Sequence, residues 1–125
     1  MTAAAVVPVK HVLIVDDCAD VRDLMGEIVR GLGYVVHEAS DGAEGLDVLG
    51  ALGAADEAPS LILLDLMMPL LDGRDFIRRL DERARSIPIV IITASGQKAV
   101  AGAREVLAKP VEPERLRDVV RTYLA

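Results

Sequence analysis

The sequence predicts an α/β fold in which helices cover both faces of a five-stranded parallel sheet, the arrangement called doubly wound. Strand-like and helical segments alternate along the chain, and this alternation requires crossover connections between parallel strands. Two of the strand-like segments, 61–65 and 87–93, are almost wholly aliphatic, which is typical of strands covered on both faces. All six prolines fall at or near predicted boundaries, which supports the same division of the chain.

The first half of the chain contains two strand–helix units. The run HVLIV at 11–15 is the first strand, and apolar residues then recur at helical spacing over 19–32, where glycines end the pattern. The weaker run YVVHEA at 34–39 is the second strand. Ser40 is placed to cap a second helix, which continues to about Leu52.

The second half continues the alternation after a small, polar loop at 50–60. Its last helix begins near Pro113, because proline is favoured in the first turn of a helix. The elements predicted here are a strand at 61–65, a helix from 74 to about 83, strands at 87–93 and 105–108, and a helix from about 113 to 123.

Length and composition restrict the class of protein. A chain of 125 residues with 52% hydrophobic residues has the size of one domain and can bury a core without disulfides. The single cysteine excludes an internal disulfide framework, and no apolar run is long enough to cross a membrane. A net charge of −6 argues against direct DNA binding. We therefore expect a cytoplasmic domain over 10–125, preceded by an N-terminal extension, 1–9, that makes a poor signal peptide.

Polar residues follow four of the predicted strands. Asp16 and Asp17 end the first strand, Asp65 ends the third, Thr93 ends the fourth, and Lys109 follows the fifth. Ligands of open parallel sheets bind beyond the carboxyl ends of the strands. Taken singly, these residues have ordinary structural explanations such as helix capping or β-propensity. Their joint position at one edge of the sheet instead predicts a functional site.

The chemistry of this set is coherent. Closely packed carboxylates repel one another unless cations lie between them, and Lys109 supplies one positive charge. Mg²⁺ is the natural second cation, since it binds carboxylate oxygens and retains several waters. Beside such an ion Asp65 can act as a nucleophile toward phosphorus, with Thr93 and Lys109 stabilising the phosphoryl oxygens.

The whole chain from about Lys10 onward resembles the receiver domains of bacterial two-component response regulators. That resemblance implies a flavodoxin-like (βα)5 fold over 10–125, as a receiver domain that signals and is not an enzyme beyond its own phosphorylation and dephosphorylation. The matching motifs are VDD (15–17), DLMMP (65–69), DG (72–73), TA (93–94) and KP (109–110).

The resemblance also implies a role for each residue of the site. Asp65 would accept a phosphoryl group from a phosphohistidine on a sensor histidine kinase or phosphotransfer protein. Asp17 and Asp65 would hold Mg²⁺ with the backbone carbonyl of Met67, and Asp16 would contribute through water. Thr93 would hydrogen-bond the phosphoryl group and Lys109 would pair with it. The Lys109–Pro110 bond is expected to be cis.

Two departures from the family pattern concern how phosphorylation is read. Val106 stands where the family usually carries Tyr or Phe, three residues before the lysine. Only fifteen residues, 94–108, separate Thr93 from Lys109. Once the fifth strand is allowed for, one or two helical turns remain between Gly96 and Gly102, so the fourth helix should be shortened.

Two other functions compete with a phosphorylatable receiver. A pseudo-receiver would keep the fold as an interaction module without being phosphorylated, but the retained acids, Thr93 and Lys109 argue against it. A phosphatase of the haloacid dehalogenase type would have a second Asp two residues after the nucleophile, where this chain has Met67. With no effector domain expected after the receiver, the signal would pass to a separate protein, and we expect a monomer or weak dimer.

Three further residues are expected to be structural. Cys18 lies near the predicted site and reads as a small buried filler, because an inert packing role is commoner than a reactive thiol. His11 and His37 lack metal-ligand spacing and fall on predicted strands.

Overall fold

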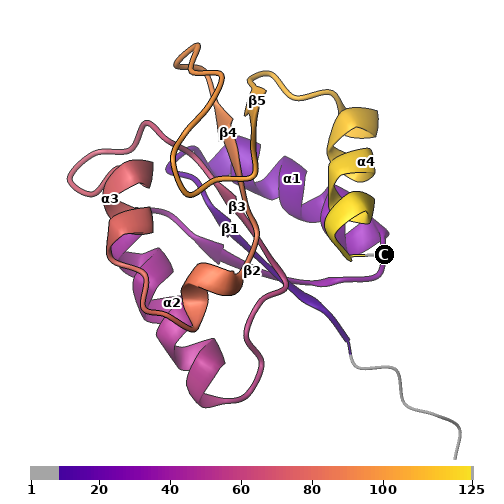
Figure 1. The fold of residues 1–125 in the computed structure, drawn as a ribbon. Helices are drawn as coiled ribbons and strands as arrows, with labels where there is room; N and C mark the ends of the chain where they lie inside the picture. The colour runs from indigo at the N-terminus through magenta and orange to yellow at the C-terminus, as the bar shows by residue number, and fades with distance from the viewer. Residues whose placement is uncertain (1–8, 125) are drawn as a thin grey trace, which may run out of the picture.

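The computed structural model describes residues 9–124, which form one parallel sheet covered by helices (Figure 1). The strand order is β2-β1-β3-β4-β5, and all four neighbouring pairs are parallel. This confirms the predicted α/β class and the five strands. The strands are β1 (His11–Val15), β2 (Val35–Ala39), β3 (Leu61–Leu64), β4 (Ile89–Thr93) and β5 (Glu105–Ala108).

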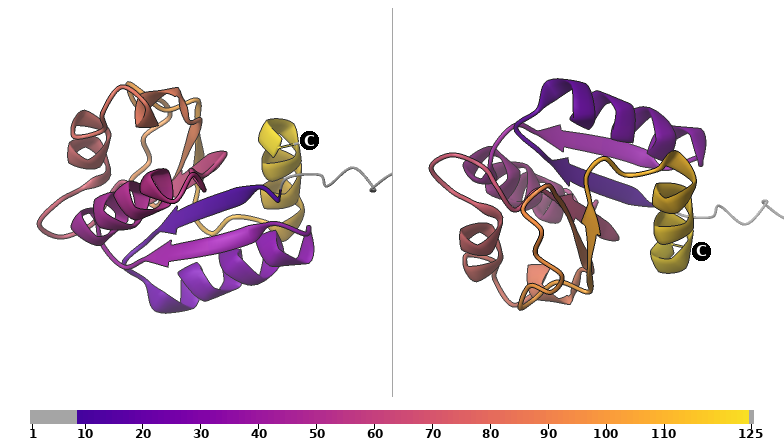
Figure 2. Two further views of the ribbon diagram at one scale, coloured as in Figure 1. Left: turned by 90° about the horizontal axis from the view of Figure 1, so that it is seen from below. Right: turned by 90° about the horizontal axis from the view of Figure 1, so that it is seen from above.

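Helices lie on both faces of the sheet, as the doubly wound prediction requires (Figure 2). One face packs against α1 and α4, and the other against α2 and α3. No helix within residues 9–124 is both long and apolar enough to cross a membrane. The helical segments are α1 (Ala19–Gly31), α2 (Gly42–Ala54), α3 (Gly73–Arg78), the 3-10 turn η1 (Ala84–Ser86) and α4 (Pro113–Leu124).

Alternating side chains of the central strands fill the two halves of the core. In β1, Val12 and Ile14 face α1 and α4, whereas Leu13 and Val15 face α2 and α3. All four are fully buried. Burial of one such side chain stabilises the fold by about 1.5–3 kcal/mol, which explains the continuous aliphatic runs of the inner strands.

Two helix ends differ from the sequence prediction. The N-cap of α2 is Asp41, whose Oδ1 accepts from the backbone N–H of Glu44 at 2.7 Å. Ser40, the predicted cap, instead donates its hydroxyl to Glu44 Oε2 at 2.7 Å. The prediction was therefore wrong by one residue, because the aspartate next to Ser40 reaches the free N–H group.

The third helix is also shorter than predicted, since α3 ends at Arg78 and not near Arg83. Asp81 Oδ1 accepts from the backbone N–H of Ala84 at 2.9 Å. That bond forms in the turn that leads into η1, and an aspartate side chain competes with the helical backbone in this way. The apolar spacing extended across this break, so the sequence did not reveal it.

No helix is present between β4 and β5 in the described part of the chain (Figure 1). The segment closes through turns, with positive φ values at Gly96 and Gly102. Val100 is buried against the α2–α3 side of the core and takes the place of helical packing residues. The prediction of a shortened fourth helix is confirmed, but the one or two helical turns expected between Gly96 and Gly102 are not formed.

Candidate functional site at the carboxyl edge of the sheet

Backbone pairing brings the predicted site residues to one edge of the sheet. The N–H of Asp16 donates to Ala39 O at 3.1 Å, and the N–H of Asp65 donates to Val15 O at 2.9 Å, so both aspartates extend the strand ladders by one residue. On the other side, the N–H of Lys109 donates to Thr93 O at 2.9 Å. Sheet geometry therefore fixes where each of these side chains begins.

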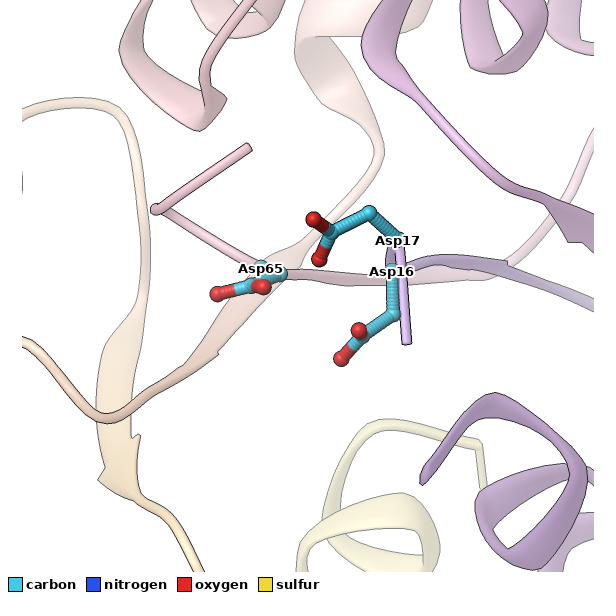
Figure 3. A group of neighbouring side chains, drawn as sticks. All are labelled: Asp16, Asp17 and Asp65. Carbon is cyan, nitrogen blue, oxygen red and sulfur yellow. The ribbon is translucent and has the colours of Figure 1, made fainter. Parts of the chain in front are cut away.

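Three carboxylates converge at this edge (Figure 3). Oxygen atoms of Asp16, Asp17 and Asp65 all lie within 4.8 Å of one another. Asp16 is fully buried and Asp65 is 5% exposed, whereas Asp17 is exposed. Two desolvated carboxylates at such short range require nearby positive charge or hydrogen-bond donors.

Lys109 supplies that charge. Its Nζ lies 2.7 Å from Asp16 Oδ2 and 3.3 Å from Asp65 Oδ2, so one ammonium bridges both buried acids. The bond from Lys109 to Pro110 is cis, as the family resemblance implied. Lys109 and the carboxylates are therefore part of one charged cluster.

The environment shifts two pKa values in this cluster. Burial raises the pKa of Asp65 above its ordinary value. Lys109 and the Met67 N–H favour the charged form, but they do not bring the pKa back down to that value. Burial alone would lower the pKa of Lys109, but its interactions with Asp16 and Asp65 raise it. Lys109 is therefore charged at neutral pH beside a carboxylate that is poorly solvated.

The donor set fits a small divalent cation. Asp16 Oδ1 accepts from the backbone N–H of Cys18 at 2.9 Å. Within residues 9–124, the one polar contact of Asp16 Oδ2 is with Lys109 Nζ at 2.7 Å. A buried oxygen with a free lone pair, beside two other carboxylates, matches the oxygen ligands that hard cations prefer.

Thr93 and Met67 lie beside the cluster in different ways. Thr93 is 1% exposed, and its Oγ1 accepts from the Ser95 N–H at 3.3 Å. No hydrogen bond joins the Thr93 side chain to Asp65 or Lys109 among the described residues. The N–H of Met67 donates to Asp65 Oδ1 at 3.2 Å, while its side chain is 63% exposed beside the site.

Gly73 explains the aspartate–glycine pair that follows the third strand. Its N–H donates to Leu66 O at 3.0 Å, and a Cβ at this position would lie 2.7 Å from the backbone oxygen of Asp65. Asp72 caps α3 by accepting from the N–H of Asp75 at 2.9 Å. The pair thus lets α3 begin directly against the backbone that carries Asp65.

Sequence reasoning missed Arg22, and it misplaced Cys18. Arg22 Nη1 donates to Asp16 O at 2.7 Å, and Arg22 Nε pairs with Glu38 Oε1 at 3.3 Å, so α1 and β2 both hold the first acidic residue in place. No motif pointed to Arg22. Cys18, expected to be a buried filler, is exposed, because it is the residue that precedes α1 at the open end of the sheet.

Comparison with known proteins identifies the family. Residues 12–121 match the model of the response regulator receiver domain. The chain is similar to sporulation initiation phosphotransferase F of Bacillus subtilis (strain 168), with 33% identity over 121 residues covering 92% of this chain and 94% of that protein. It is also similar to the DNA-binding dual master transcriptional regulator RpaA of Synechocystis, at 36% identity over 122 residues, covering 91% of this chain and 48% of that protein. The chain thus spans about half the length of RpaA and of several other regulators that it matches.

Solved structures agree with the sequence matches. Chemotaxis protein CheY4 of Vibrio cholerae superposes with a TM-score of 0.77 at 26% identity, covering 94% of this chain and 100% of that chain. The receiver domain of the hybrid histidine kinase CckA gives a TM-score of 0.76 at 27% identity, covering 92% and 99%. The sheet and its acidic edge define a CheY-like, flavodoxin-like receiver fold. The chain belongs to the response regulator receiver domain family of two-component systems.

Proposed function

We propose that Asp65 accepts a phosphoryl group from the phosphohistidine of a sensor histidine kinase or of a phosphotransfer protein. The observation that carries this proposal is the contact of Lys109 with both buried acids, 2.7 Å from Asp16 and 3.3 Å from Asp65. An ammonium held there can neutralise the oxygens of a transferring phosphoryl group.

In the transfer step, a carboxylate oxygen of Asp65 forms a bond to phosphorus while the bond between phosphorus and the donor imidazole nitrogen breaks. The imidazole leaves with the electron pair of that bond. Lys109 pairs with the phosphoryl oxygens, and the Thr93 hydroxyl donates a hydrogen bond to them. Thr93 is already at this edge, because its backbone oxygen accepts from the Lys109 N–H at 2.9 Å.

The transfer depends on Mg²⁺ held by Asp17, Asp65 and the backbone carbonyl of Met67, with Asp16 acting through water. The convergence of the three carboxylates supports this assignment. When bound, the ion supplies positive charge for the phosphoryl oxygens. The chain's own contribution is to position the acids and to keep Lys109 charged among them.

The phosphorylated domain, 10–125, signals or relays to a separate protein in the cytoplasm, as a monomer or weak dimer and without binding DNA itself. A net charge of −6 and the similarity to a sporulation phosphotransferase over nearly its full length support this proposal. Residues 1–8, most of the predicted N-terminal extension, lie outside the residues that the structure describes.

The test is phosphoryl incorporation from acetyl phosphate, followed by intact-mass spectrometry with Mg²⁺ or with EDTA. Wild type should gain one phosphoryl group in Mg²⁺ and react at least tenfold more slowly in EDTA. Asp17→Asn removes one exposed carboxylate of the cluster and should also react at least tenfold more slowly. Asp20→Asn, an exposed acid in the first turn of α1, is the matched control and should behave as wild type.

Equal rates in Mg²⁺ and EDTA would refute the metal assignment. No incorporation at all, in conditions that modify another receiver run in parallel, would refute the phosphoacceptor role and favour a pseudo-receiver that acts through binding alone.

A further inference from the structure

The two histidines of the chain meet on the surface of the sheet. His11 Nδ1 and His37 Nε2 lie 2.9 Å apart, although 26 residues separate them in the sequence. The ring planes are within 16° of parallel and their centroids are 5.2 Å apart, much farther than the two nitrogens. The rings therefore approach nitrogen to nitrogen and do not stack face to face.

Strand register produces this contact. In the parallel pairing of β1 with β2, Leu13 lies opposite His37. His11 is two residues before Leu13 and so points to the same face of the sheet. Because β2 is the edge strand, both imidazoles are only partly buried and remain accessible from solvent.

The loop after α2 lies beside the same end of β1. The N–H of Ser60 donates to His11 O at 2.8 Å, and the N–H of Glu57 donates to Leu52 O at 2.8 Å. These bonds hold the loop beside the first residue of β1. Glu57 in this loop is exposed.

The environment of His37 favours its neutral form. Burial and the neighbouring His11 lower the pKa of His37, and Glu57 opposes this shift only in part. An N–H···N contact also needs one nitrogen without a proton. Neutral imidazole is the form that binds metal ions.

The spacing is close to that of two histidines on one metal ion. Zinc–nitrogen bonds of 2.0–2.1 Å at a tetrahedral angle put two ligand nitrogens about 3.3 Å apart. A small side-chain rotation that moves the nitrogens apart by a few tenths of an ångström would open the present 2.9 Å contact to that value. Imidazole nitrogens suit zinc, copper and nickel, whereas the carboxylate cluster at the other end of the sheet suits magnesium.

We propose that His11 and His37 together form a binding site for a divalent transition-metal ion such as Zn²⁺. The site lies at the start of β1, and Asp16 follows the end of the same strand, about 16 Å away for five residues of extended chain. A bound ion would link β1 and β2, and would stabilise the folded state through binding. This site is independent of the proposed phosphorylation chemistry.

The experiment is a titration of the tag-free full chain with ZnCl₂ in excess Mg²⁺, using calorimetry for affinity and stoichiometry. NMR of the imidazole nitrogens reports the ligands, since the chain has only two histidines. We expect one bound Zn²⁺ with both rings shifted, and Mg²⁺ alone should shift neither. His37→Gln and His11→Gln should each weaken zinc binding at least tenfold.

A double variant, Asp17→Asn with Asp65→Asn, separates this site from the acidic cluster and should bind zinc as wild type does. Circular dichroism confirms that each variant is folded, and two independent histidine variants guard against the failure of one. The proposal is overturned if both folded histidine variants keep wild-type zinc affinity, if the aspartate double variant loses zinc binding, or if the imidazole signals do not move.

Discussion

Asp65 has a carboxylate at the end of an aliphatic strand, where burial disfavours its charge. The folded protein raises the pKa of Asp65, so the native state binds a proton there more tightly than the unfolded chain does. Because proton binding and folding are linked, such a group lowers the free energy of unfolding as the pH rises past its pKa in the unfolded chain and through its higher pKa in the folded protein. The residue needed for chemistry is therefore expected to cost stability at neutral pH.

Asp65→Asn should accordingly be more stable than wild type at pH 7.5, and the difference should shrink as the pH falls toward 4. Urea unfolding in EDTA at several pH values measures this difference. Asp72→Asn changes an aspartate that caps α3, outside the cluster. It should show no comparable pH-dependent gain. If Asp65→Asn were less stable at pH 7.5, or its advantage did not change with pH, burial would not dominate at this position.

Lys109 is expected to have the opposite effect on stability. Its removal leaves Asp16, which is fully buried, without its neighbouring ammonium. Breaking a buried ion pair from one side costs about 3–5 kcal/mol. Lys109→Met should lower the free energy of unfolding at pH 7 by roughly the lower end of that range. Urea unfolding measures the loss, and the exposed Lys98→Met is the control, expected within about 0.5 kcal/mol of wild type.

At the scale of elements, α2 shows that two glycines of one helix can differ in whether the fold requires them to lack a side chain. A Cβ at Gly42 would lie 2.7 Å from the backbone oxygen of Leu71, so the start of α2 can approach the loop before α3 only without a side chain. A Cβ at Gly50 would meet nothing within 4 Å. The sequence shows both as glycines in a helical pattern and cannot distinguish them, because the difference depends on a neighbour far along the chain.

Alanine substitutions in α2 test this distinction. Gly42→Ala should destabilise the protein by about 1–3 kcal/mol, because the backbone oxygen of Leu71 must move. Gly50→Ala should stabilise it by up to about 1 kcal/mol, since alanine favours the helix and finds open space. Thermal unfolding of the two variants gives the comparison, and equal effects would show that the close approach to Leu71 is not needed.

At the scale of the whole molecule, periodicity and strand ends predicted the sheet and placed five polar residues at one edge. The structure puts oxygen atoms of Asp16, Asp17 and Asp65 within 4.8 Å of one another there. Lys109 pairs with Asp16 and Asp65. The shortened fourth helix followed from counting residues. The contact between His11 and His37 depends on the register of β1 against β2, which neither strand encodes alone. The sequence did not predict the end of α3, because the apolar spacing continues past it and does not show that the Asp81 side chain accepts from the Ala84 N–H.

The absence of a helix between β4 and β5 predicts a local difference in dynamics. Amides between Gly96 and Val100 have no helical hydrogen bonds, whereas α4 is continuous from Pro113 to Leu124. Hydrogen exchange resolved by peptide mass spectrometry should therefore show exchange over 96–100 at least tenfold faster than in the centre of α4. Protection of 96–100 equal to that of α4 would contradict the loop described between β4 and β5.

The most direct test of the central proposal is where the phosphoryl group goes. Wild type, Asp65→Asn and Asp72→Asn would be treated with acetyl phosphate and Mg²⁺ and compared by intact-mass spectrometry. We predict one phosphoryl group on wild type and on Asp72→Asn, released by hydroxylamine as an acyl phosphate is, and none on Asp65→Asn. An equal adduct on folded Asp65→Asn would contradict the account, because the acceptor would then be a residue other than the aspartate that Lys109 contacts.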